Sequence, residues 1–162
     1  MNFDFIAMNL TGFTFYSIYN SYGYFISEDQ TGKVDLNDLL FSYHAIIATL
    51  LTLSQIMIFP KQSNKIHTPT IIYLVVMWTF LAVWTLLTDV PILLSQGLKI
   101  IDVSVDVRSV SLMGYCKLSI SFLKYLPQFY WNYKRKSTVG WSIINIILDF
   151  TGGFFSFLQM GL

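Results

Sequence analysis

The 162 residues are 54% hydrophobic and 17% aromatic, and only 12% of them are charged. A soluble domain carries about 25% charged residues, so this composition excludes an ordinary soluble protein and is typical of a helical membrane protein. The formal net charge is +1, and the basic residues are scattered, which gives no basic surface for binding nucleic acid. The single cysteine, Cys116, has no partner for a disulfide within the chain.

Five apolar segments are long enough to cross a membrane, because about 20 helical residues cover 30 Å of hydrocarbon. The expected helices cover residues 3–26, 39–59, 70–87, 110–133 and 141–162. Between the third and fourth helices, the segment Pro91–Ile101 is too short to cross and is expected to lie in the membrane interface. The predicted fold class is therefore all-α and transmembrane.

The charges in the connections predict an orientation. The turns at 60–69 and 134–140 hold five lysines and arginines and no acid. The connections at 21–38 and 88–109 hold three lysines and arginines with seven acids. Because basic residues accumulate in cytosolic loops, the two basic turns are expected in the cytosol and the acidic connections in a lumen or outside the cell.

An internal repeat relates the first and last segments. Residues 9–15, NLTGFTF, and 149–155, DFTGGFF, share the pattern [Asn/Asp]-x-Thr-Gly-x-x-Phe. The two segments are four crossings apart and point the same way, as in carriers built from two parallel three-helix bundles and a linker helix. The remaining helices of such a repeat would precede Met1 and follow Leu162. We therefore expect five helices of a seven-helix protein.

Three ionisable side chains fall inside the apolar segments: Lys117 and Lys124 in the fourth and Asp149 in the fifth. A charge at the centre of a bilayer costs about 2.5–3.5 kcal/mol, so all three are expected to face an internal, wettable cavity. Polar residues at helical spacing extend this surface along three helices. They are Asn2, Asn9, Tyr16 and Asn20 on the first, Lys117, Ser121, Lys124, Gln128 and Asn132 on the fourth, and Ser142, Asn145, Asp149, Gly152, Ser156 and Gln159 on the fifth.

The sequence YLPQ at 125–128, followed by Asn132 and by KSTVGWS at 136–142, resembles the second motif of the PQ-loop repeat family. This motif covers about 117–160. Residues 136–160 resemble more narrowly the cystinosin family of proton-coupled lysosomal cystine exporters. The resemblance extends over nearly the whole chain except about 88–109, where the connection is longer and more polar than in the family. It implies a seven-helix transporter of the 3+1+3, SWEET-like type.

The same resemblance implies symport of L-cystine and protons from the lysosome to the cytosol, across a lysosomal or vacuolar membrane and without a cofactor or metal. Cystine carries two carboxylates and two ammonium groups, so its site needs fixed cations, neutral donors and acceptors, and a counter-charge. The substrate site is predicted to comprise Asn9, Tyr16, Lys117, Lys124, Gln128, Asn132, Asn145 and Asp149. Asp38 and Asp149 are predicted to carry the coupled protons. Pro127 removes a backbone donor and bends its helix, which makes it the predicted hinge.

Two other functions fit the same pattern. One is a PQ-loop carrier for another amino acid, although two fixed cations would repel a cationic side chain. The other is a seven-helix membrane cargo receptor or adaptor, which does not need polar stripes that reach both ends of the helices. An enzyme is not expected, because the sequence offers no metal cluster, nucleophile–base pair or phosphate-binding loop.

The individual site residues also have structural interpretations. Lys117 or Lys124 alone would snorkel or form a structural pair, and Asp149 would neutralise a lysine in a static pair. Asn9 would hydrogen-bond a neighbouring helix, and Asp38 would cap the second helix.

Two further features are expected to be structural. The pair Gly152–Gly153 is expected to allow close helix packing rather than to contact a ligand. His44 and His67 are expected to be ordinary helix and loop histidines.

Overall fold

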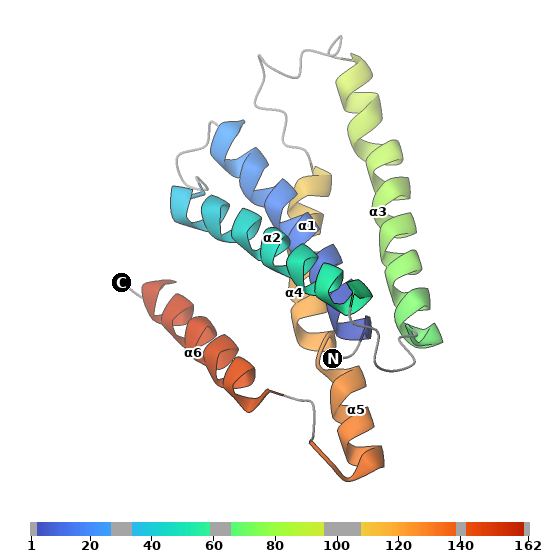
Figure 1. Ribbon diagram of the computed structural model, residues 1–162. Helices are drawn as coiled ribbons and strands as arrows, with labels where there is room; N and C mark the ends of the chain where they lie inside the picture. Colours follow the sequence, from blue (N-terminus) through green and yellow to red (C-terminus); the bar gives the residue numbers. More distant parts are fainter. Residues whose placement is uncertain (1–2, 27–33, 59–65, 96–107, 139–141, 161–162) are drawn as a thin grey trace.

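The computed structural model describes residues 3–26, 34–58, 66–95, 108–138 and 142–160. These residues form six α-helices and no strand (Figure 1), which confirms the all-α class. The helices are α1 (Phe3–Phe25), α2 (Leu36–Ile58), α3 (Thr68–Ser95), α4 (Arg108–Leu123), α5 (Leu126–Arg135) and α6 (Ile143–Met160).

Two of the described helical stretches, Leu36–Ile58 and Thr68–Pro91, are long and apolar enough to cross a membrane. Their mean hydropathies are 1.5 and 2.1, and their outward faces expose leucine, isoleucine, valine and phenylalanine side chains. A soluble protein rarely exposes so continuous an apolar surface, whereas hydrocarbon chains solvate it well. These faces are therefore suited to contact with lipid.

The fourth expected segment forms two helices instead of one. α4 ends at Leu123 and α5 begins at Leu126, with Pro127 in the first turn of α5. Tyr125 occupies the N-cap position of α5 without a side-chain capping hydrogen bond. Proline lacks a backbone N–H and is tolerated in the first turn of a helix, where that N–H has no intrahelical partner. A break just before the proline therefore costs less than a proline inside one continuous helix.

The expectation of an interfacial segment after the third helix is wrong for residues 91–95. α3 continues through Pro91 to Ser95, while residues 96–101 lie outside the described part of the chain. The assignment of Asp89 to an acidic loop is wrong as well, because Asp89 lies inside α3 and its side chain is buried. Hydropathy alone did not distinguish the last turns of a long helix from a short separate segment.

α1 is the central helix and packs against α2, α3 and α4 (Figure 1). The buried core contains Met8 and Phe15 of α1, Met77 and Leu81 of α3, and Ile120 of α4. α6 packs against no other described helix and stands apart from the bundle in Figure 1. Side chains from the junction between α4 and α5 reach across to α6 and help to hold it.

The two glycines that share a position in the internal repeat differ in their surroundings. A Cβ atom added to Gly12 would lie 3.1 Å from Cγ2 of Ile120, so this glycine lets α1 approach α4 closely. A Cβ atom added to Gly152 would meet nothing within 4 Å among the described residues. The expected close packing at Gly152 is therefore wrong for the part of the chain that the structure describes.

Two fully buried carboxylates tie α3 to its neighbours. Asp4 of α1 accepts a hydrogen bond from the backbone N–H of His67 at 2.7 Å and also pairs with the His67 ring. Asp89 accepts from the backbone N–H of Ser109 at 3.2 Å and from the Thr88 hydroxyl at 3.1 Å. The first N–H groups of a helix lack intrahelical partners and favour negative charge. Each carboxylate therefore caps a helix start from another helix, and His67 is more than an ordinary loop histidine.

We expect Asp89→Ala to lower the free energy of unfolding by about 1–3 kcal/mol, because the N–H of Ser109 would be buried without a partner. Thermal denaturation of the detergent-purified protein measures the loss. Asp89→Asn keeps an acceptor oxygen and should lose less. Melting temperatures equal to that of the parent protein for both variants would contradict the capping role.

Candidate functional site

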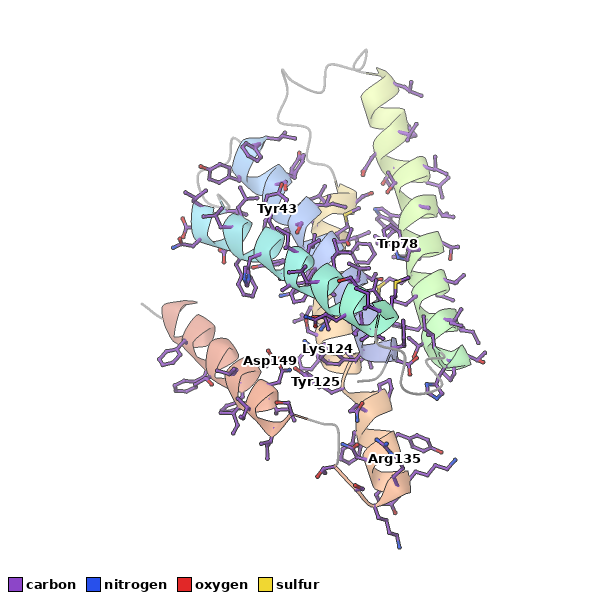
Figure 2. All side chains as sticks on the ribbon, viewed as in Figure 1. Tyr43, Trp78, Lys124, Tyr125, Arg135 and Asp149 are labelled. Atoms are coloured by element: carbon purple, nitrogen blue, oxygen red, sulfur yellow. The ribbon has the colours of Figure 1, made fainter. Side chains whose placement is uncertain are left out.

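The centre of the candidate site is the carboxylate of Asp149, which α6 presents to the break between α4 and α5 (Figure 2). Its Oδ2 atom lies 3.5 Å from Nζ of Lys124 and accepts a hydrogen bond from the hydroxyl of Tyr125. The Lys124 side chain is only 12% exposed, whereas that of Asp149 is 46% exposed. A mostly buried ammonium is thus neutralised by a half-exposed carboxylate.

Aromatic rings enclose the ammonium group of Lys124. Its Nζ lies 4.9 Å from the ring centroid of Tyr125 and 5.3 Å from that of Phe5, and the two rings are 5.6 Å apart. The negative face of an aromatic ring attracts a cation. Residues of α1, of α6 and of the α4–α5 junction therefore meet around this one charge.

A second group of polar residues surrounds Lys117. Its Nζ lies 4.1 Å from the ring centroid of Tyr16, and the charges of Lys124 and Asp38 both act on it. Lys117 precedes Lys124 by seven residues, which is about 10.5 Å along a helix. Asn20, one turn further along α1, donates to the backbone carbonyl of Asp38 at 3.0 Å. This group therefore links α4 through α1 to the start of α2.

Asp38 is the third residue of α2 and is exposed. The backbone carbonyl of Asp35 accepts from the N–H groups of Asp38 and Leu39 at 3.1 and 3.2 Å. Asp35 therefore stands at the N-cap, and the interpretation of Asp38 as the helix cap is wrong.

Two buried amide side chains lie on α5. Nε2 of Gln128 donates to Oδ1 of Asn132 at 3.0 Å, and the two residues are 9% and 7% exposed. The Nδ2 atom of Asn132 has no hydrogen-bond partner among the described residues. A buried donor without a partner costs about 1–3 kcal/mol and is uncommon in native structures. This atom is thus available to an additional acceptor.

The structure does not join the two remaining predicted substrate residues to this network. Asn9 is half-buried on α1, and Asn145 is exposed near the start of α6. The backbone N–H of Asn145 donates to the hydroxyl of Ser142 at 3.3 Å. Within the described residues, neither side chain hydrogen-bonds another predicted site residue.

The sequence analysis missed one residue of the site centre, Tyr125. It was named only as part of the YLPQ motif, although its position beside Lys124 and two residues before Pro127 was visible. The structure brings Lys124 to Asp149, Lys117 to Tyr16 and Gln128 to Asn132. Their roles in binding and proton transfer stay predictions.

The chemistry of the site suits a charged, polar solute. It offers the cations Lys117 and Lys124 on α4 and at the α4–α5 junction, the acids Asp38 and Asp149 on α2 and α6, and, on α5, an amide donor without a partner among the described residues. Among the described residues, no group of three histidine, cysteine, aspartate or glutamate side chains is placed to hold a metal ion.

Residues 110–161 match a family model described as PQ loop repeat. Cystinosin of Drosophila melanogaster is 38% identical and cystinosin of Bos taurus 33% identical over 99% of this chain. A cystine transporter of Saccharomyces cerevisiae is 27% identical over the same share. The alignments cover 40%, 43% and 65% of the three relatives. The chain thus spans about two-fifths of the length of the fly and bovine proteins.

Removal of Asp149 and removal of Lys124 should lower the thermal stability by different amounts. Asp149→Ala leaves a mostly buried ammonium without its counter-charge, whereas Lys124→Met leaves a carboxylate that is half exposed. We therefore expect the larger loss of thermal stability from Asp149→Ala. The double variant should be about 1 kcal/mol more stable than the sum of the single losses predicts. Strictly additive losses in thermal unfolding would show that the two groups do not interact.

Proposed function

Because this chain is a PQ-loop repeat protein of the cystinosin family, we propose that it forms the substrate pathway of a proton-coupled L-cystine transporter. The activity belongs to the full-length protein, since the chain spans about two-fifths of its fly and bovine relatives. The observation that carries the proposal is the half-exposed carboxylate of Asp149 beside the mostly buried cation of Lys124.

The distribution of charges supports recognition of a molecule with two amino-acid ends. Lys117 and Lys124 lie two helical turns apart, and each has an acid in its electrostatic surroundings, Asp38 and Asp149 respectively. Each lysine binds one carboxylate of cystine, and the acids balance its ammonium groups. The Nδ2 atom of Asn132, which has no partner among the described residues, donates to a substrate oxygen. A cationic amino acid would gain less from this site, because its side chain would meet a second fixed cation.

The Lys124–Asp149 pair also gives a physical basis for coupling. An ionised Asp149 competes with a substrate carboxylate for the ammonium of Lys124. A protonated Asp149 is neutral and leaves that ammonium to the substrate. Proton binding and substrate binding therefore favour each other, and such coupling is reciprocal. Asp38 acts on Lys117 in the same way at the other end of the site.

The break between α4 and α5 allows the site to change the side of the membrane to which it is open. α5 carries the buried amides Gln128 and Asn132 and ends in the basic residues Lys134 and Arg135. We assign its basic end to the cytosol by the positive-inside rule. Movement of α5 at Pro127 then opens the site to the cytosol, so that cystine and protons leave a lysosomal or vacuolar lumen together.

Asp149→Asn should abolish the proton current that cystine evokes, because asparagine cannot release a proton. The measurement is the current at acidic luminal pH in cells that carry the full-length protein at the surface. Asp35→Asn, at the exposed start of α2, serves as the matched control and should retain the current. A normal proton current in Asp149→Asn would exclude this carboxylate from coupling.

Asn132→Ala should raise the KM for cystine about tenfold, which corresponds to the loss of one hydrogen bond of about 1.4 kcal/mol. Uptake of labelled cystine into proteoliposomes measures this constant. Tyr133→Phe changes an exposed neighbour on the same helix and should leave the KM unchanged. An unchanged KM in Asn132→Ala would remove this amide from the substrate site.

A further inference from the structure

Tyr125 occupies an unusual position between the site and the helix break. It is the N-cap residue of α5, and its backbone carbonyl accepts from the N–H of Phe129 at 2.9 Å. Its hydroxyl donates to Asp149 on α6 (Figure 2). Its ring lies against Phe5 of α1. One side chain therefore connects the start of α5 to the carboxylate of the site.

A single oxygen of Asp149 serves two donors. Its Oδ2 atom accepts from the Tyr125 hydroxyl and faces Nζ of Lys124 at 3.5 Å. An ionised carboxylate has lone pairs enough for both donors, whereas a proton on Oδ2 turns that oxygen into a donor. A proton on Asp149 therefore weakens this arrangement, because a neutral carboxyl group is a poorer acceptor for the Tyr125 hydroxyl than a carboxylate is and no longer neutralises Lys124.

The charged and titratable groups around this carboxylate are few in the described part of the chain. Lys124 and Tyr125 face it from the α4–α5 junction, and Lys117 acts on Lys124 from two turns earlier on α4. The nearby residue of α1, Phe5, is apolar. Tyr125 is the neutral donor in this group, so its bond depends directly on the ionisation of Asp149.

We propose that Tyr125 is the positioning residue through which ionised Asp149 holds the start of α5, so that protonation of Asp149 releases the helix break. The inference rests on the proposed function and adds the side chain through which the protonation of Asp149 affects the position of α5. α6 packs against no other described helix, so this hydrogen bond and the Lys124 pair are the described side-chain contacts between α6 and the junction.

The test compares Tyr125→Phe with Tyr130→Phe in the full-length protein. Phenylalanine keeps the ring against Phe5 and removes only the hydroxyl. Tyr130 is exposed on α5 and serves as the matched control. The hydroxyl favours the ionised carboxylate, so without it Asp149 takes up its proton at a lower proton concentration. The luminal pH of half-maximal cystine-evoked current should therefore rise by about one unit in Tyr125→Phe alone.

A second measurement does not depend on transport. The infrared C=O band of protonated Asp149, assigned as the band that Asp149→Asn removes, is followed against pH in purified protein. Its midpoint should rise in Tyr125→Phe and stay unchanged in Tyr130→Phe. Equal midpoints for Tyr125→Phe and the parent protein, with normal cystine-evoked current in the parent, would overturn the role of Tyr125 and leave the proposed function intact. A parent protein that gives no cystine-evoked current would overturn both.

Discussion

A charge inside a membrane must be paired or hydrated, and the buried ammonium of Lys124 imposes this requirement on the helices around it. The ammonium is enclosed by the rings of Phe5 and Tyr125 and neutralised by Asp149. α1, α4, α5 and α6 all contribute to this arrangement, although α6 has no helix packing of its own among the described elements. Among the described elements, the position of α6 therefore depends on electrostatics more than on apolar packing.

Much of the helical arrangement could be predicted, because long apolar runs leave few alternatives to membrane helices. The break before Pro127 followed from the chemistry of proline, yet its consequence, a separate α5 with its own N-cap, did not. The extent of α3 was also missed. A carboxylate such as Asp89 is predicted in a loop unless its partner is known, and that partner, Ser109, lies twenty residues further along the chain.

The candidate site shows the same division between local and long-range information. Helical spacing placed Lys117 and Lys124 on one face, and the structure shows both oriented toward aromatic side chains of α1. The pairs Asp4–His67 and Tyr125–Asp149 join segments 63 and 24 residues apart. Periodicity within one helix carries no information about such contacts. The family resemblance is confirmed by the relatives, while the binding roles of the individual residues stay predictions.

Three acids of the described helices, Asp4, Asp89 and Asp149, fall into two physical classes. Asp4 and Asp89 are almost completely enclosed, and each accepts from a backbone N–H at the start of a helix. Neither backbone donor can move away from its carboxylate without unwinding its helix. Asp149 is half exposed, and its partners are the side chains of Lys124 and Tyr125, which can rotate away. Of these three carboxylates, Asp149 is thus the one that no backbone donor holds in the described part of the chain.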